Sequence, residues 1–470
     1  ASLWIQQTDL VIGEITEEGG VISPGGIGFD INCLSAETKI LHRYGYYRTI
    51  RKIVAGRVND PVRCYSLETK KSQSAKTQFV LWKEPTTQVV ELITTNGRRI
   101  VATEDHPFLT PTGMKLLGEL ERGDRVAVDP FEGVPYENPG EEILVSEEDV
   151  RRFLSENGKT GGNAVTQILN ILLRRKLLPL RRNSSALPVL IKALGFVMGD
   201  GTLHFVGRTG KGRAWFFGKP EDLEEIRRDL APWFQVSRIY TRARRHWIET
   251  DYEAYEFHSK ESCVRVGSSA FTVLLALLGC PVGNKSLQDY EVPRWLTTAP
   301  LWQKRLFLAT YFGAELQSPA AYAERNRNFK CPLLTLQKQE NYIESGRKFL
   351  NQIGKLCQEF GVEILTIEER RERVERKHGY SKRLRLAFSS QPDSLLTLYS
   401  RIGFEYNRRK RQLASVAAAY QLAKLRIWRT REILVSQAVQ LNSEGFSQAE
   451  VAEQLVASPL GRLGGANPSF

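Results

Sequence analysis

Apolar and polar positions change their period several times along the chain, and each change marks a different kind of segment. The alternation in Gln88-Val-Val-Glu-Leu-Ile-Thr, followed by the turn at Thr95-Asn-Gly97, predicts a strand in a β-rich region. From Val145 to Leu180 apolar residues recur at helical spacing, and after Lys410 the chain becomes strongly helical. These patterns predict a mixed protein with a β-rich lobe near its start and a helical tail.

Two stretches stand apart because they are apolar at almost every position, contain small residues and end in an acid. They run from Leu190 to Asp200 and from Leu306 to Glu315. Glycine and alanine at helical spacing within them allow two helices to approach backbone to backbone. We therefore predict two packed helices that bring the carboxylates of Asp200 and Glu315 together. Taken alone, each stretch is equally well explained as a buried helix with a terminal acid.

Closely spaced carboxylates are what a two-metal phosphodiesterase uses to hold divalent cations. The paired stretches resemble the duplicated LAGLIDADG motif of homing endonucleases. That resemblance implies an α+β pseudo-dimer of two αββαββα halves over residues 186–410. It also implies that Asp200 and Glu315 are catalytic residues that bind Mg²⁺.

The same resemblance singles out two lysines near the ends of the halves. Lys285 and Lys410 occupy places where the family has a lysine that faces the scissile phosphate, so both are candidate catalytic residues. Surface lysines are common, and a purely structural role for them is the alternative. Leu316 stands where a glycine usually follows the second acid. A DNA-binding protein without catalysis therefore remains open.

The charge of the chain points towards a polyanionic partner. The formal net charge is +13 and the sequence pI is near 9.4, and Lys and Arg gain free energy by displacing counterions from nucleic acid. A solvated basic surface is the alternative. Strand-like pieces within 186–410 alternate basic and aromatic residues, as a sheet that contacts DNA would. The candidate DNA-binding residues are Arg213, Arg238, Arg242, Arg244, Arg245, Lys382, Arg383 and Arg385.

A change in sequence character at Cys33 indicates a second kind of chemistry. Upstream, the segment from Gly19 to Cys33 resembles the metal-binding loop of the RtcB family of RNA-splicing ligases, and Asp30 matches a manganese-binding Asp of that loop. Downstream, Cys33-Leu-Ser-Ala-Glu-Thr resembles the opening block of an intein. The segment Thr103-Glu-Asp-His106 resembles the T-x-x-H block of the same family.

The intein resemblance implies a β-rich, horseshoe-like Hint lobe that carries a splicing nucleophile. Cys33 would attack the preceding carbonyl to give a thioester, Thr103 would help to hold that carbonyl, and His106 would protonate the departing nitrogen. The sequence shows no terminal His-Asn block, so the lobe is expected to be only partly formed. Complete splicing is then expected to need a separate C-terminal piece.

These resemblances lead to one functional prediction. It is an intein-encoded, Mg²⁺-dependent endonuclease that cuts double-stranded DNA at the uninterrupted insertion site of the host gene. An autoprocessing protein is the alternative. RNA ligation by this chain is set aside because the histidines that complete the ligase metal site are absent, so Mn²⁺ is expected only for the intact ligase.

The expected division follows the segments described above. It comprises a host-ligase fragment at 1–32, a Hint lobe at 33–130, a linker with a helical module at 131–185, the nuclease at 186–410 and a helical tail at 411–470. The tail includes a segment like a truncated helix-turn-helix. With 41% hydrophobic and 25% charged residues, the chain has no apolar run near the roughly 20 residues of a membrane span. A cytoplasmic monomer without a membrane partner is expected.

Overall fold

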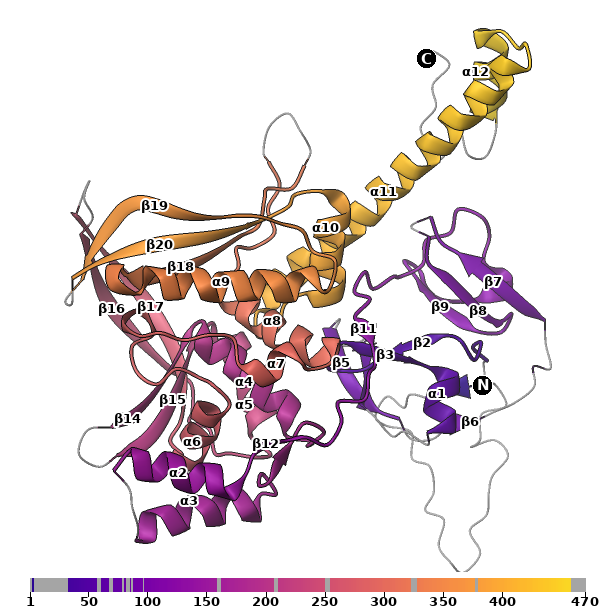
Figure 1. The fold of residues 1–470 in the computed structure, drawn as a ribbon. Helices are drawn as coiled ribbons and strands as arrows, with labels where there is room; N and C mark the ends of the chain where they lie inside the picture. The colour runs from indigo at the N-terminus through magenta and orange to yellow at the C-terminus, as the bar shows by residue number, and fades with distance from the viewer. Residues whose placement is uncertain are drawn as a thin grey trace, which may run out of the picture. The chain divides into compact units, whose positions relative to one another are not determined.

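The structure is a computed structural model that divides into two compact units. It describes residues 2–3, 33–56, 61–66, 71–77, 80–81, 85, 88–95, 97–158, 162–206, 210–249, 254–322, 328–376 and 379–457. The first unit comprises residues 1–133 and 418–470, and the second comprises residues 134–417. The expected host-ligase fragment, apart from residues 2–3, and the last part of the tail lie outside the described residues. Figure 1 shows the elements of each unit.

Short antiparallel hairpins make up most of the first unit (Figure 1). Consecutive strands pair in each hairpin, as expected where turn residues separate short alternating segments. The elements are β1 (Ser2–Leu3), β2 (Lys39–Leu41), β3 (Tyr46–Thr49), α1 (Ile50–Ala55), β4 (Pro61–Ser66), β5 (Lys71–Lys76), β6 (Val80–Leu81), β7 (Val89–Ile93), β8 (Arg99–Thr103), β9 (Pro107–Thr110), β10 (Gly113–Leu116) and η1 (Leu117–Glu119). The predicted strand at 88–94 corresponds to β7.

Two helices follow in the C-terminal part. Helix α11 (Arg408–Ser443) crosses the division between the units in sequence, and α12 (Gln448–Ala457) lies in the first unit. Ser447 begins α12 with a capping box, because its amide N–H donates to Glu450 Oε2 at 2.8 Å and its Oγ accepts from the Glu450 amide at 3.4 Å. No helix of the described residues is both long enough and apolar enough to cross a bilayer.

The second unit begins with small elements that precede its two larger halves. These are β11 (Val134–Pro135), β12 (Ile143–Val145), α2 (Glu147–Glu156), α3 (Asn163–Arg174) and β13 (Leu180–Arg181). Helices α2 and α3 take the region where helical spacing was predicted, and both contact a later helix of this unit, α6 (Ser269–Leu277).

The first half of the second unit has the element order αββαββα. Its members are α4 (Leu187–Met198), β14 (Gly201–Val206), β15 (Lys211–Gly218), α5 (Pro220–Leu230), β16 (Tyr240–Glu249), β17 (Ala254–Val266) and α6. The four strands form one antiparallel sheet in the order β14-β15-β17-β16. A connection containing η3 (Lys285–Leu287) and α7 (Arg294–Thr297) leads to the second half.

The second half repeats this plan with one strand fewer among the described residues. It contains α8 (Leu301–Glu315), β18 (Leu333–Gln339), η4 (Glu340–Tyr342), α9 (Ile343–Gln358), β19 (Ile364–Arg376), β20 (Gly379–Phe388), α10 (Pro392–Thr397) and the π-helical η5 (Leu398–Ile402). Its sheet has the order β18-β20-β19, and α9 packs along it (Figure 1). The expectation of two strands directly after the helix is not met in the described residues. Instead, the isolated bridges Leu316↔Leu334 and Ala321↔Phe329 flank Pro319, which has no amide N–H to donate to a ladder. The mixed α/β class is nevertheless confirmed.

Helices α4 and α8 pack backbone to backbone at the centre of the second unit. A Cβ placed on Gly195 would lie 2.3 Å from Thr310 Oγ1 and 2.6 Å from the Phe307 carbonyl oxygen. One placed on Gly199 would lie 2.5 Å from the Ala314 Cβ. Every residue of α4 is buried. The small residues of the two stretches therefore permit the contact that was predicted from their spacing.

This packing leads to a stability prediction. We expect Gly195→Ala to destabilise the second unit by about 1–3 kcal/mol, because overpacking a tight contact outweighs the better helix propensity of alanine. Gly354→Ala is the matched control, since a Cβ there meets its nearest atom, Ile364 Cγ1, at an ordinary 3.5 Å. Urea unfolding should show opposite signs for the two changes. Equal midpoints for both variants would contradict the close helix contact.

Candidate functional site

The packing of α4 against α8 brings two acids to one place. Asp200 follows the last turn of α4, and Glu315 is the final residue of α8. A Cβ on Gly199 would lie 3.2 Å from Glu315 Cγ, so the residue before one acid touches the side chain of the other. Asp200 keeps part of its surface exposed although the packed helix ends surround its carboxylate, and Glu315 is half-buried. Asp200 also lines a hollow of about 340 Å³ together with residues that include Phe217, Lys260 and Asn407.

Two lysines occupy equivalent positions beside these acids. Lys285 Nζ donates to the carbonyl oxygens of Val197 at 2.9 Å and Met198 at 3.0 Å, and also to that of Gly199. These are the three carbonyls before Asp200, and they belong to the C-terminal end of α4, where helical carbonyls lack intrahelical partners.

Lys410 does the same for α8. Its Nζ donates to the carbonyl oxygens of Phe312 at 3.2 Å, Gly313 at 2.8 Å and Ala314 at 3.1 Å, which directly precede Glu315. A cation at this end of a helix also interacts favourably with the helix dipole. The structure therefore brings together the four residues predicted from sequence, with each lysine capping the helix that carries one acid.

Burial and mutual repulsion shift the pKa values of this cluster. Burial, together with the charge of Asp200, raises the pKa of Glu315 to about 7, against the pull of both lysines. Burial likewise raises the pKa of Asp200, and the two lysines oppose that change. Burial lowers the pKa of Lys410 to about 8 and also lowers the pKa of Lys285. Such opposed shifts in one small cluster are typical of a functional site.

The donor set of the cluster suits a hard divalent cation. Carboxylate oxygen is the ligand that Mg²⁺ prefers, and Mg²⁺ usually takes only one or two carboxylates, with substrate phosphates and waters as the remaining ligands. Within the described residues, no group of three or more His, Cys, Asp or Glu side chains is close enough to hold a metal ion. The two carboxylates therefore suit a cation that takes its remaining ligands from a phosphate and from water.

Leu316 does not disturb the end of α8. It adopts an extended backbone, is fully buried and forms a β-bridge with Leu334. At the equivalent place in the first half a side chain would not fit, because a Cβ on Gly201 would lie 2.6 Å from the Val197 Cα. The two halves thus differ at this position without displacing Glu315 from the helix end.

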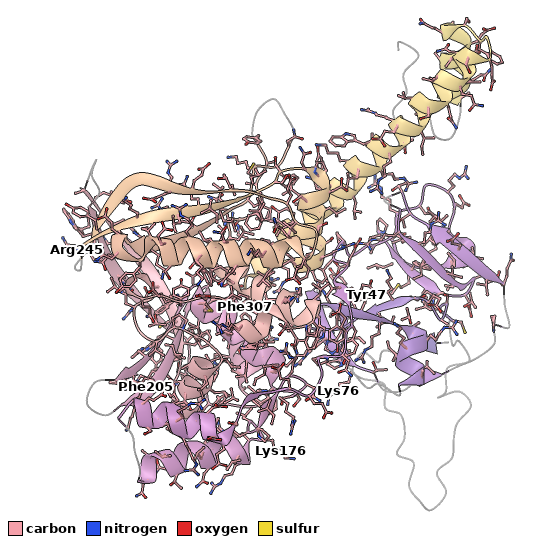
Figure 2. The ribbon with its side chains drawn as sticks, viewed as in Figure 1. Tyr47, Lys76, Lys176, Phe205, Arg245 and Phe307 are labelled. Carbon is pink, nitrogen blue, oxygen red and sulfur yellow. The ribbon has the colours of Figure 1, made fainter. Side chains whose placement is uncertain are left out.

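The candidate DNA-binding residues lie on strands of the second unit, except Arg238, which precedes β16, and several of them pair with acidic side chains. Arg242 and Arg244 share Glu261, Arg245 pairs with Glu256, and Lys382 pairs with Glu369. The Arg242, Arg244 and Arg245 side chains are 59%, 50% and 71% exposed, and Figure 2 labels Arg245. Of the remaining candidates, Arg213, Arg383 and Arg385 are half-buried, and Arg238 is exposed.

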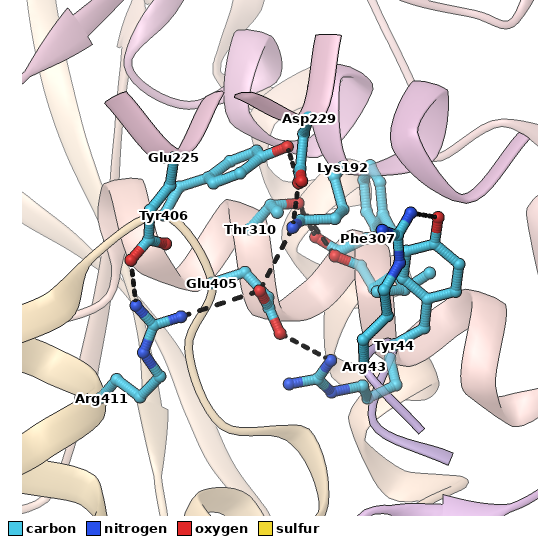
Figure 3. Close-up of polar contacts among 12 residues, drawn as sticks. Arg43, Tyr44, Lys192, Glu225, Asp229, Phe307, Thr310, Glu405, Tyr406 and Arg411 are labelled. Carbon is cyan, nitrogen blue, oxygen red and sulfur yellow. Dashed lines mark hydrogen bonds and ion pairs between the residues drawn. The ribbon is translucent and has the colours of Figure 1, made fainter. Parts of the chain in front are cut away.

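A network of buried charges, missed in the sequence, joins the two halves (Figure 3). Glu405 accepts from Arg305 of α8 at 2.8 Å and lies 3.4 Å from Lys192 of α4. Lys192 also pairs with Asp229 at 2.5 Å, which accepts from the Tyr406 hydroxyl at 2.8 Å. The one signal in the sequence was Lys192, a charge inside an otherwise apolar helix.

The splicing candidates lie in the first unit. The Cys33 amide N–H donates to Thr103 Oγ1 at 3.0 Å, and the Thr103 amide donates to the Cys33 carbonyl at the same distance. His106 follows in the same turn, and its amide N–H donates a hydrogen bond to the Thr103 carbonyl. Its buried Nδ1 has no hydrogen-bond partner among the described residues, and burial lowers the pKa of the ring. Asp30 lies outside the described residues.

Comparison with known proteins gives homology to ligases. No protein-family model matches the chain. It is 33% identical over 448 residues to the tRNA-splicing ligase RtcB of Methanopyrus kandleri, covering 95% of this chain and 43% of the relative. It is 36% identical over 411 residues to RtcB of Pyrococcus abyssi, covering 87% and 42%. The chain thus spans about two fifths of the length of these curated relatives.

Other matches are not ligases. An RNA polymerase subunit, Rpo1N of Methanocaldococcus jannaschii, is 32% identical over 351 residues, covering 74% of this chain and 25% of the subunit. Among solved structures, the homing endonuclease I-WcaI bound to its DNA recognition sequence matches with a TM-score of 0.32 and 13% identity, covering 48% of this chain and 86% of that one.

The ligase relatives overturn the functional prediction. RNA ligation was not expected from the sequence, whereas five relatives that match 85 to 95% of this chain are named tRNA-splicing ligases. The prediction was wrong because it counted metal-binding histidines in this chain alone. The relatives are more than twice as long as the part that this chain matches.

Proposed function

We propose that the second unit hydrolyses phosphodiester bonds of double-stranded DNA at a centre formed by Asp200, Glu315, Lys285 and Lys410. One observation carries the proposal. Asp200 and Glu315 lie at the C-terminal ends of two packed helices. The three backbone carbonyls before each acid accept hydrogen bonds from the ammonium group of one lysine. This duplicated arrangement provides equivalent groups for the two strands of a duplex.

Each group in this centre has a chemical task. The carboxylates of Asp200 and Glu315 would hold Mg²⁺, which supplies Lewis-acid stabilisation and a more acidic bound water. The ammonium groups of Lys285 and Lys410 keep positive charge next to the carboxylates, where a phosphate gains charge during cleavage. Their bonds to helix carbonyls fix them in place, so the positive charge is positioned in advance.

The exposed arginines of β16 are suited to bind the phosphates of double-stranded DNA. Arg242, Arg244 and Arg245 are held by carboxylates, so binding would exchange Glu261 and Glu256 for backbone phosphates. Such an exchange makes affinity fall steeply with salt concentration. The exposed aromatic residues Tyr240 and Trp247 lie on the same strand and add contact area.

RNA ligation is a further activity that we propose for this protein. Homology to tRNA-splicing ligases supports it, and Mn²⁺ would serve that activity. Because the chain also matches part of an RNA polymerase subunit, the shared segment occurs outside ligases. The centre at Asp200 and Glu315 is therefore proposed as an activity separate from ligation.

A second activity is proposed for Cys33, in keeping with the intein resemblance. The reciprocal backbone and hydroxyl bonds between Cys33 and Thr103 fix the nucleophile beside the T-x-x-H turn. The Cys33 thiolate would attack the Asn32 carbonyl carbon, the Asn32–Cys33 amide bond would break, and the amine would take up a proton. The product is a thioester that an added thiol can cleave.

This second activity predicts a specific cleavage. Dithiothreitol should release residues 1–32 from the wild-type chain, whereas Cys33→Ala should reduce that release to the background level. Cys64→Ala is the control, and it should behave as wild type. Mass spectrometry of the released peptide gives the measurement, and equal release from Cys33→Ala would reject Cys33 as the nucleophile. DNA cleavage should be unchanged in both variants.

The test of the main proposal uses DNA of unspecified sequence. A library of random duplexes is incubated with the chain and Mg²⁺, and new ends are captured and sequenced. Ends that recur at defined positions and disappear with EDTA are expected. Tight duplex binding without any new ends in Mg²⁺ or Mn²⁺ would contradict hydrolysis.

A further inference from the structure

The loop that carries Lys285 is held from the opposite half of the second unit. Strand β18 has the burial alternation of a half-buried strand, with Leu334, Leu336 and Lys338 facing inward. Lys338 therefore takes a core position that a leucine would be expected to occupy, and it is fully buried. Burying an ammonium is costly unless its donors are satisfied, so its partners decide why it is there.

The partners of Lys338 are the two ends of the Lys285 turn. Lys338 Nζ donates to the Lys285 carbonyl at 2.9 Å and to the Gln288 carbonyl at 2.6 Å, which bracket η3. It also lies 3.9 Å from the centre of the Tyr290 ring, a favourable cation–π contact. Burial lowers its pKa to about 8, with Asp289 opposing the shift and Lys285 adding to it.

The surroundings leave room for this lysine. Gly346 of α9 faces its aliphatic stem, and a Cβ there would lie 2.9 Å from Lys338 Cγ. The turn itself is fastened to the first half, because the Gly283 amide donates to the Leu203 carbonyl at 2.7 Å. Lys338 thus joins the second half to a turn whose own lysine caps α4 of the first half.

We propose that Lys338 is a positioning residue that holds the Lys285 ammonium at the end of α4, next to Asp200 and Glu315. The catalytic part of this statement rests on the proposed phosphodiester hydrolysis. Its geometric part does not, because the position of Lys285 can be measured without DNA or metal.

Lysine acetylation followed by mass spectrometry tests the geometric part. In Lys338→Met, the acetylation rate of Lys285 should rise at least about tenfold, whereas that of Lys410 should stay at the wild-type value. Lys304→Met is the matched control, since Lys304 is also buried and bonds a single carboxylate, Glu359, at 2.5 Å. Unchanged labelling of Lys285 in Lys338→Met would overturn the proposal.

Cleavage tests the catalytic part. Single-turnover cleavage by Lys338→Met should fall about 10- to 100-fold with duplex affinity within twofold of wild type, since small misplacements of reacting groups cost this much. In a Lys285→Met background the same change should have no further effect. Additive losses, or full activity, would overturn it. If the wild type does not cut but the labelling result holds, only the proposed hydrolysis fails.

A gentler variant covers the case in which Lys338→Met does not fold. Gly346→Ala keeps the ammonium and pushes a methyl group against the lysine stem. It should raise Lys285 acetylation and lower cleavage several-fold in a chain whose melting temperature shows that it is folded. A folded Gly346→Ala chain with wild-type labelling and cleavage would reject the proposal.

Discussion

Asp200→Asn and Glu315→Gln should each lower Mg²⁺-dependent DNA cleavage by at least about 10³-fold. Each change keeps the size of the side chain and removes one anionic metal ligand, and a bound cation supplies several kcal/mol of transition-state stabilisation. Duplex affinity should stay the same or improve, because a negative charge next to the phosphates is lost. Single-turnover rates on a selected duplex, with affinity measured in Ca²⁺, separate the two effects.

Stability gives this prediction an internal check. Because burial raises the pKa of Glu315, its charged form is disfavoured in the folded chain, and the associated stability is lost as pH rises through about 7. Glu315→Gln should therefore be at least as stable as wild type above pH 7. Glu221→Gln, an exposed acid on α5 of the same unit, should cut normally. Cleavage that survives both Asp200→Asn and Glu315→Gln would exclude the metal assignment.

Glu405→Gln should destabilise the second unit by about 3–5 kcal/mol. The Glu405 carboxylate faces three cations, with Arg305 at 2.8 Å, Lys192 at 3.4 Å and Arg411 at 3.9 Å. Lys192 keeps Asp229 and Arg411 keeps Glu225, but Arg305 loses the carboxylate it bonds, and a buried charge left without its partner costs about this much. Urea unfolding measures the loss. Glu291→Gln, which breaks an exposed pair with Lys348, should change little.

The pH dependence of that loss follows from the pKa of Glu405. Burial alone would raise the pKa, but Lys192, Arg305 and Arg411 outweigh burial and hold it far below the usual range. A depressed pKa contributes stability above the unfolded pKa of about 4.3, and this contribution is lost as pH falls. The difference between wild type and Glu405→Gln should therefore shrink below about pH 4. A difference that is constant with pH would mean that the charge is not responsible.

The sequence predicted the parts of this site that have a local pattern. The small residues of α4 and α8 predicted a close contact between the two helices. The same stretches predicted that the acids at their ends lie together. Lys285 and Lys410 were found only through resemblance, and the structure adds that their ammonium groups cap the two helices.

The parts that were missed depend on contacts between distant segments. Lys338 continues the inward alternation of Leu334 and Leu336, but its bonding partners, the Lys285 and Gln288 carbonyls, come from a distant turn that no local pattern identifies. Glu405 receives its three cations from α4, α8 and α11, which no local spacing reveals. Within the described part of the second half, isolated bridges on either side of Pro319 take the place of the expected strand.

The function was the part that sequence patterns resolved least well. RNA ligation was excluded because metal-binding histidines are absent from the sequence, and homology to tRNA-splicing ligases contradicts that exclusion. The proposed hydrolysis does not depend on that exclusion, because it rests on the acids at the ends of α4 and α8 and on the two lysines beside them.

The central claim is that Asp200 and Glu315 together hold a divalent cation on a DNA phosphate. X-ray diffraction from crystals of the chain with a selected duplex and Mn²⁺, recorded at the manganese edge, locates the metal by its anomalous signal. The account predicts a peak within coordination distance of both carboxylates and of a backbone phosphate. Manganese bound elsewhere, with the duplex in place and no peak between Asp200 and Glu315, would contradict it.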